Sequence, residues 1–223
     1  MIPNRQRIIV FLCILILIVT FFLGSYILSQ SHTKRSLTFS NDYFSLEMDT
    51  VIRRFYVNGS NVLAKYLMFQ LEEDYQLNWK LETPNRFSYI KEENNIITVF
   101  TFSQLFTYDI FKTFVFYTDK PFFLVEISKT YTIDAFSDNN QILVDVFNDH
   151  FVLLNNHTFV FFLLDLKHKL VIQILDSSPE IVIQEPVTTE AQFNFNGRSD
   201  RDITFHQKGQ IETVRFNVTV ANL

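Results

Sequence analysis

The sequence predicts a mainly β protein in which one N-terminal transmembrane helix precedes an antiparallel β-sandwich. Three observations predict this class: an uncharged apolar run near the N-terminus, stretches in which apolar and polar residues alternate, and short β-branched and aromatic runs bounded by turn residues. The composition agrees, because 16% of the residues are aromatic and Phe alone occurs 26 times. Disordered chains lack such residues.

The first element is the uncharged apolar run that begins at Ile8 and ends at Leu28. At about 20 residues it has the length that an α-helix needs to cross a hydrocarbon core of ~30 Å. A cleaved signal peptide is the alternative, although the apolar region of a signal peptide is usually shorter. We therefore expect residues 1–28 to form a cytoplasmic stub and a single-pass signal-anchor. The polar residues 29–41 are expected to form a juxtamembrane linker.

The orientation of this anchor follows from the charges beside it. Arg5 and Arg7 precede the apolar run, and Lys34 and Arg35 follow it. Positive charge favours the cytoplasmic side, so the two flanks are nearly balanced, and the terminal amine tips the balance toward a cytoplasmic N-terminus. Residues 42–223 are then expected to form one domain on the extracellular, periplasmic or lumenal side of the membrane.

Three sequons agree with a lumenal or extracellular domain. Asn58, Asn156 and Asn217 each begin an Asn-X-Ser/Thr triplet, which is the acceptor pattern for N-glycosylation. A chain this rich in Asn, Ser and Thr contains such triplets by chance as well. The sequence therefore predicts these three residues as candidate glycosylation sites of a glycoprotein.

The remaining elements are predicted as strands. Residues 75–82 alternate between apolar and polar at every step, and residues 211–220 are β-branched and partly alternating. Runs that are apolar on both faces predict buried strands at residues 96–102, 111–117, 122–127, 159–164 and 170–175. Residues 60–73 are ambiguous between helix and strand, because Leu63, Leu67 and Leu71 recur at helical spacing.

Turn residues separate these strands. Residues 92–95 predict a four-residue hairpin loop, and residues 137–140 and 196–200 predict further loops. Pro121 predicts a turn after Asp119 and Lys120. Lys208 and Gly209 predict a turn before the last strand.

The strand-turn-strand of residues 115–127, centred between Tyr117 and Glu126, resembles one found in galactose mutarotase-like β-supersandwich domains. Such domains lie beside catalytic domains in several glycoside hydrolases and polysaccharide lyases. The resemblance covers about a dozen residues and carries over no catalytic residue. It implies a β-supersandwich fold and an association with glycans.

The sequence contains no recognisable catalytic, cofactor-binding or metal-binding motif. The net charge of −5 excludes a basic surface for nucleic acid. We find no nucleophile motif, cofactor loop or metal-ligand spacing, so no catalytic residue, cofactor or metal is predicted and an enzyme is not favoured. Several isolated residues could take part in chemistry only if the fold gathered them: His150, His157, Asp109, Asp145, Asp149 and Asp165.

The function expected from these observations is that of a membrane-anchored extracytoplasmic binding or assembly module. Its partners would be the membrane, through the run from Ile8 to Leu28, and a protein or a glycan. The alternative is a carbohydrate-binding or carbohydrate-active domain, because aromatic faces suit sugar rings and the resemblance points to glycans.

Overall fold

The structure is a computed structural model. It describes residues 36–63, 66–75, 78–81, 86–137, 139–145, 151–155, 157–178, 182–183, 192–196 and 204–223. These residues belong to one compact unit, Ser36–Leu223. Within the described ranges no helix has the length and hydropathy that crossing a membrane requires. The predicted anchor between Ile8 and Leu28 lies outside those ranges.

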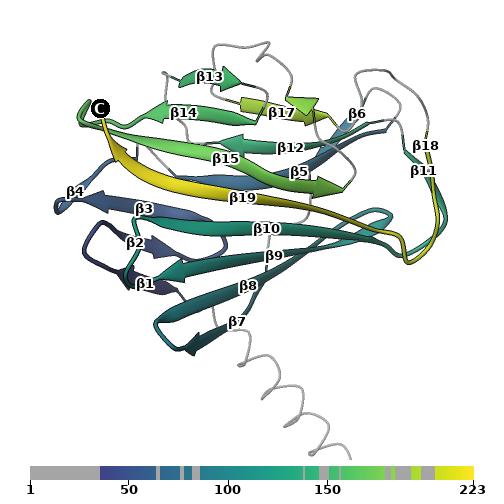
Figure 1. The fold of residues 1–223 in the computed structure, drawn as a ribbon. Helices are drawn as coiled ribbons and strands as arrows, with labels where there is room; N and C mark the ends of the chain where they lie inside the picture. The colour runs from purple at the N-terminus through teal and green to yellow at the C-terminus, as the bar shows by residue number, and fades with distance from the viewer. Residues whose placement is uncertain are drawn as a thin grey trace, which may run out of the picture. The chain divides into compact units, whose positions relative to one another are not determined.

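The largest sheet has eight antiparallel strands in the order β13-β14-β15-β19-β10-β9-β8-β7. Figure 1 shows its long strands β15, β19, β10, β9 and β8 side by side. The last strand, β19, pairs with β15 on one side and β10 on the other, and so joins two halves of the sheet that are far apart in sequence. The bounds are β7 (Arg86–Glu93), β8 (Ile96–Leu105), β9 (Tyr108–Tyr117), β10 (Phe122–Tyr131), β13 (Phe151–Asn155), β14 (Thr158–Phe162), β15 (His168–Ser178) and β19 (Ile211–Asn222).

Three smaller antiparallel sheets complete the described fold. One has four strands, β1 (Leu37–Ser40), β2 (Ser45–Met48), β3 (Ile52–Val57) and β4 (Ser60–Asn61). Another has five strands in the order β16 (Val182–Ile183), β17 (Gln192–Asn196), β12 (Asn139–Asp145), β5 (Met68–Tyr75) and β6 (Asn78–Leu81). The smallest pairs β11 (Ala135–Ser137) with β18 (Thr204–His206). The mainly β, antiparallel class that the sequence predicts is confirmed.

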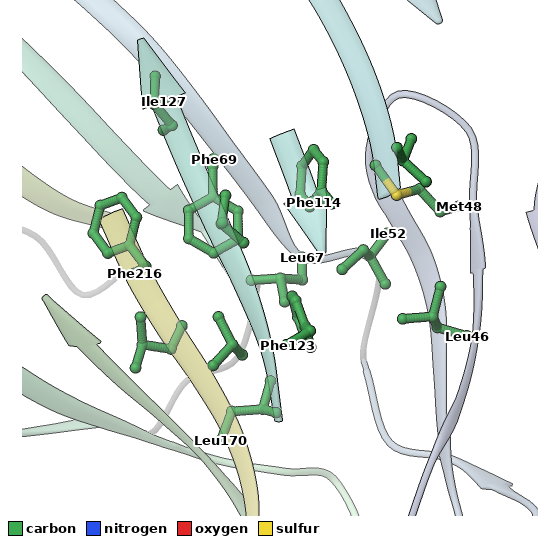
Figure 2. Packing of buried hydrophobic residues seen from close by; sticks show 14 of the residues in the cluster. Leu46, Met48, Ile52, Leu67, Phe69, Phe114, Phe123, Ile127, Leu170 and Phe216 are labelled. Atoms are coloured by element: carbon green, nitrogen blue, oxygen red, sulfur yellow. The ribbon is translucent and has the colours of Figure 1, made fainter. Parts of the chain in front are cut away.

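Aromatic side chains fill the space between the eight-stranded sheet and the two larger of the other sheets. Phe39 of β1 stacks on Phe116 of β9, with ring centroids 5.2 Å apart. Phe69 of β5 packs against Phe114 of β9 and Phe216 of β19, at 6.3 and 5.4 Å (Figure 2). Buried Phe rings contribute most to core stability because each removes a large apolar area from water.

In the described part of the chain, a single isolated β-bridge joins the four-stranded and five-stranded sheets into one layer. The backbone N–H of Ile52 donates to the carbonyl of Leu67 at 3.1 Å, and that of Leu67 donates back at 2.9 Å. Both side chains are buried, and Figure 2 shows Leu67 between Ile52 and Phe69. The packing is therefore sandwich-like, with one face of the eight-stranded sheet turned toward a composite second layer.

One strand prediction needs correction, and one ambiguous segment is resolved. The single strand predicted for residues 75–82 is wrong, because Tyr75 and Asn78 are register partners and the chain reverses between β5 and β6. Alternation specifies which face a side chain takes but does not reveal a reversal. The ambiguous residues 60–73 contribute to β4 and β5 rather than to a helix. At the other end of the domain, β1 occupies residues 37–40 of the expected linker, with Leu37 and Phe39 buried.

The turns are shorter than the sequence predicted. Glu93 pairs with Ile96, so the loop predicted for residues 92–95 is a two-residue turn of Asn94 and Asn95, at φ 48° and 65°. Asn tolerates positive φ, which a tight hairpin of this kind requires. Asn139 of the loop predicted for residues 137–140 belongs to β12. The turns at Pro121 and at Gly209, where φ is 83°, are confirmed, and residues 197–200 lie outside the described part.

Candidate functional site

Polar side chains occupy one end of the inward face of the eight-stranded sheet. Alternation turns Tyr108 and Lys112 of β9, and Lys129 and Tyr131 of β10, toward the second layer, and all four are buried. The other end of the same strands carries Phe and Val. Burying a Lys side chain costs free energy unless its ammonium group is paired. Packing alone therefore does not explain why Lys112 and Lys129 occupy this end of the face.

An ion pair lies at the centre of this end. The Lys129 Nζ is 2.5 Å from Oε2 of Glu212, its register partner on β19. The same Nζ lies 4.9 Å from the ring centroids of both Tyr108 and Tyr131, in cation–π geometry. We call Tyr108, Lys129, Tyr131, His206 and Glu212 the Lys129 cluster.

His206 joins the cluster from β18. Its ring stacks on Tyr131 with centroids 4.3 Å apart and an interplanar angle of 6°, and its Nδ1 is 3.3 Å from Oε1 of Glu212. The exposed Gln210 closes the cluster toward solvent, because its Nε2 lies 3.3 Å from both His206 Nδ1 and Glu212 Oε1. One carboxylate, one imidazole and one amide therefore converge at a single edge, and the exposed amide of Gln210 is the one of the three that a hydroxyl-rich ligand can reach.

Two tight turns hold this edge in place. The backbone N–H of Gly209 donates to the carbonyl of Tyr131 at 2.8 Å, and that of Tyr131 donates to the carbonyl of Gln210 at 3.0 Å. The next residue, Thr132, donates from both its backbone N–H and its hydroxyl to the carbonyl of Thr107, at 2.8 and 2.9 Å. The β8–β9 turn and Gln210 are thus fixed at the same end of the sheet.

The β8–β9 turn exposes an aromatic ring at this end. Phe106 is 73% exposed and has a φ of 26°, between the register partners Leu105 and Tyr108. Positive φ favours Gly or Asn, and a bulky side chain there is strained. Backbone strain in a native protein often marks a functional position. An exposed ring on a strained turn is therefore the most unusual feature beside the Lys129 cluster.

A second polar cluster lies on the β14–β15 turn. The Nδ1 of the buried His168 is 2.5 Å from Oδ2 of Asp165, while Oδ1 of Asp165 accepts the backbone N–H groups of Lys167 and His168 at 3.0 and 3.1 Å. Burial raises the pKa of Asp165, but the hydrogen bonds from His168 and the two N–H groups outweigh it, so the pKa lies below its ordinary value. Asn58 Nδ2 approaches His168 Nε2 at 3.5 Å.

The residues singled out from the sequence are dispersed. Asp165 helps to form the second cluster, whereas Asp109 accepts a hydrogen bond from Gln104 on the outward face and His157 is exposed in a turn. Asp149, His150 and Asn156 lie outside the described residues, as does the side chain of Asp145. The described part holds no group of three or more His, Cys, Asp or Glu side chains placed to bind a metal.

Sequence reasoning missed the Lys129 cluster. His206 and Glu212 are close in sequence, but Lys129 and Tyr131 reach them only through the pairing of β10 with β19. One signal was available. Lys112 and Lys129 interrupt the inward, apolar positions of strands whose alternation is otherwise regular.

Comparisons with known proteins relate the chain by fold alone. No protein-family model matches the sequence, and no curated protein matches it. Heparan sulfate lyase HepC from Pedobacter heparinus superposes with a TM-score of 0.57 at 13% identity, covering 84% of this chain and 36% of the lyase. This chain thus corresponds to about a third of that enzyme.

Two further similar structures are matched over nearly their whole length. A Synechocystis protein has a TM-score of 0.51 at 7% identity, covering 86% of this chain and 97% of its own. A galactose mutarotase-like protein from Lactobacillus casei has a TM-score of 0.47 at 7% identity, covering 84% of this chain and 100% of its own. Galactose mutarotase-like proteins, which residues 115–127 resemble, are thus among the similar structures.

Proposed function

We propose that this chain is a membrane-anchored domain that binds carbohydrate at the end of the eight-stranded sheet where Phe106 and Gln210 are exposed. The proposal depends on one observation: Phe106 is 73% exposed and lies on a strained turn, two residues before Tyr108 of the Lys129 cluster. An aromatic face stacks on the apolar face of a sugar ring. The neighbouring Gln210 side chain is exposed, and its amide can exchange hydrogen bonds with the hydroxyl groups of the sugar.

The fold supports the same class of ligand. Heparan sulfate lyase HepC and galactose mutarotase-like proteins, which share this fold, act on or are named for carbohydrates. A fold hosts many functions, so this support is by analogy and the argument depends on the site.

The anchor is the second part of the proposal. The run from Ile8 to Leu28 is apolar and long enough to span a bilayer, and β1 begins at Leu37, only a short segment later. A domain held this close to a membrane meets surface glycans at high effective concentration, which favours a weak binder. We place the domain on the extracytoplasmic side, where such glycans lie.

A glycan array probed with the full-length chain in detergent tests the binding. We expect a defined set of glycans to bind, and Phe106→Ala to weaken that binding at least about tenfold, or ~1.4 kcal/mol. The matched control is Phe111→Ala, because Phe111 is also exposed but lies on the outward face against Phe102. Absence of any bound glycan, or equal losses in the two variants, would contradict the proposal.

A second pair of variants separates stacking from hydrogen bonding. Gln210→Ala removes an exposed amide that contacts Glu212, and Gln104→Ala removes an exposed amide that contacts Asp109 on the outward face, at 2.8 Å. Only the first should weaken glycan binding. Equal binding by both variants would show that Gln210 does not contribute.

Assembly with a protein partner is the second candidate. Leu164 and Leu166 of the β14–β15 turn are exposed, and so is Leu223, whose backbone N–H donates to the carbonyl of Lys167 at 2.9 Å. Three exposed apolar side chains at one end of the domain suit a protein contact. Crosslinking of the chain in native membranes that recovers only the monomer would count against this role.

A further inference from the structure

The β3–β4 hairpin presents a sequon on an open surface. Asn58 and Gly59 form its two-residue turn at φ 50° and 77°, and Val57 pairs with Ser60. These are the conformations of a type I′ turn, which Asn-Gly favours. Asn58, Gly59 and Ser60 are all exposed, and nothing lies within 4 Å of the position that a Cβ on Gly59 would take.

The surroundings of Asn217 are the opposite. Asn217 lies in β19, between its partners Gln173 of β15 and Leu124 of β10, near the middle of the eight-stranded sheet. Its side chain is half-buried, and its Oδ1 is buried without a hydrogen-bond partner. A glycan is bulky and belongs on the surface, so one attached to this amide would have to displace the neighbouring strand side chains.

Modification of Asn58 disturbs little of the fold. The contact between its Nδ2 and His168 Nε2 is long, at 3.5 Å, and His168 is held independently by Asp165 at 2.5 Å. An N-linked sugar replaces one of the two amide hydrogens and leaves the other. The turn can therefore carry a sugar while the Asp165–His168 pair stays in place.

We propose that Asn58 carries an N-linked glycan and that Asn217, although it has the same acceptor pattern, does not. This inference rests on the proposed extracytoplasmic placement of the domain, but it is independent of carbohydrate binding at Phe106. It concerns the covalent attachment of a sugar at a hairpin that belongs to a different sheet.

The test expresses the full chain in a eukaryotic secretory host. Enzymatic release of N-glycans in ¹⁸O-water marks each formerly glycosylated Asn, and peptide mapping reads the occupancy. We expect a mark at Asn58 and none at Asn217. An unmarked Asn58, or a marked Asn217 in folded protein, would overturn the proposal.

Matched variants confirm the assignment without relying on one substitution. Ser60→Ala removes the acceptor pattern but keeps the Asn58 side chain and its contact with His168, whereas Asn58→Gln removes the acceptor itself. Both should lower the mass of the chain by one glycan. Ser60→Ala should leave the melting temperature nearly unchanged, whereas Asn58→Gln should lower it slightly, because Gln tolerates the φ of 50° less well than Asn. Thr219→Ala, which removes the pattern at Asn217, should leave the mass of the attached sugar unaltered, and a loss of glycan there would also overturn the proposal.

Discussion

Lys129 and Glu212 form an ion pair that is almost entirely removed from water. Their Nζ and Oε2 atoms are 2.5 Å apart, and the two side chains are 5% and 13% exposed. They are register partners on β10 and β19, strands that are neighbours in the sheet but far apart in the chain. The pair therefore couples the folding of the C-terminal strand to the formation of the polar end of the sheet.

Breaking this pair from one side is expected to be costly. Glu212→Gln leaves the Lys129 ammonium without its carboxylate and should lower the free energy of unfolding by about 3–5 kcal/mol. The double variant Lys129→Met/Glu212→Leu removes both charges and should recover most of that loss. Urea denaturation measures both, and a single variant as stable as the parent would contradict the description of the pair as buried.

Phe69 is expected to be a major contributor to the stability of the core. It packs between Phe114 and Phe216 and lies on the strand that follows the bridge between the two smaller sheets. Phe69→Ala should lower the free energy of unfolding by about 3–5 kcal/mol, because a cavity remains in a close-packed interior. Phe111→Ala, which truncates a half-exposed ring, should cost less than about 1 kcal/mol. Similar losses in the two variants would contradict this packing.

Phe106 is expected to lower the stability of the domain while its ring contributes to glycan binding. Phe106→Gly places the residue that best tolerates positive φ in the strained turn, so the free energy of unfolding should rise by up to about 1 kcal/mol. The same substitution removes the ring and should weaken glycan binding as much as Phe106→Ala does. A Phe106→Gly variant that is less stable than the parent but binds the glycan equally well would show that the ring stabilises the fold and does not contribute to binding.

Asp165 should contribute to stability at neutral pH and lose that contribution in acid. Its pKa is lowered in the folded state by hydrogen bonds that outweigh the effect of burial, whereas an unfolded Asp has a pKa of ~3.9. The stabilisation is therefore fully present above the unfolded pKa and is lost as the pH falls through the folded one.

The measurement for Asp165 is the free energy of unfolding between pH 2 and pH 6. Asp165→Asn should flatten the acid part of this curve relative to the parent. Asp49, whose pKa is lowered through hydrogen bonds from Arg53 and backbone N–H groups despite the opposing effect of burial, contributes with the same sign in both proteins. Parallel curves for parent and variant would contradict the role assigned to Asp165.

The strands were predictable where local pattern decides them. Alternation and β-branched runs located β8, β9, β10, β15 and β19, because side-chain direction in a strand has a period of two. The reversal between Tyr75 and Asn78 escaped prediction, since regular alternation continues across it. The two-residue length of the turn after β7 was not predicted either, because the sequence alone does not reveal that Asn94 and Asn95 both take positive φ.

The site was less accessible to sequence reasoning than the fold. Lys129 meets Glu212 and His206 only after β19 inserts between β10 and β15, a pairing that no local signal encodes. In the sequence Phe106 cannot be distinguished from the many buried Phe residues, and only the structure shows that it is exposed in a turn. The polar interruptions of inward positions by Lys112 and Lys129 were the sole hint within those strands.

Hydroxyl-radical footprinting of the full-length chain, with and without a glycan selected on the array, tests the central claim most directly. Phe106 and Phe111 are both exposed aromatic rings and therefore both react, which makes each an internal control for the other. We predict that the glycan protects Phe106 from oxidation and leaves Phe111 unchanged. Protection of Phe111 alone, or of neither ring at saturating glycan, would contradict binding at this end of the sheet.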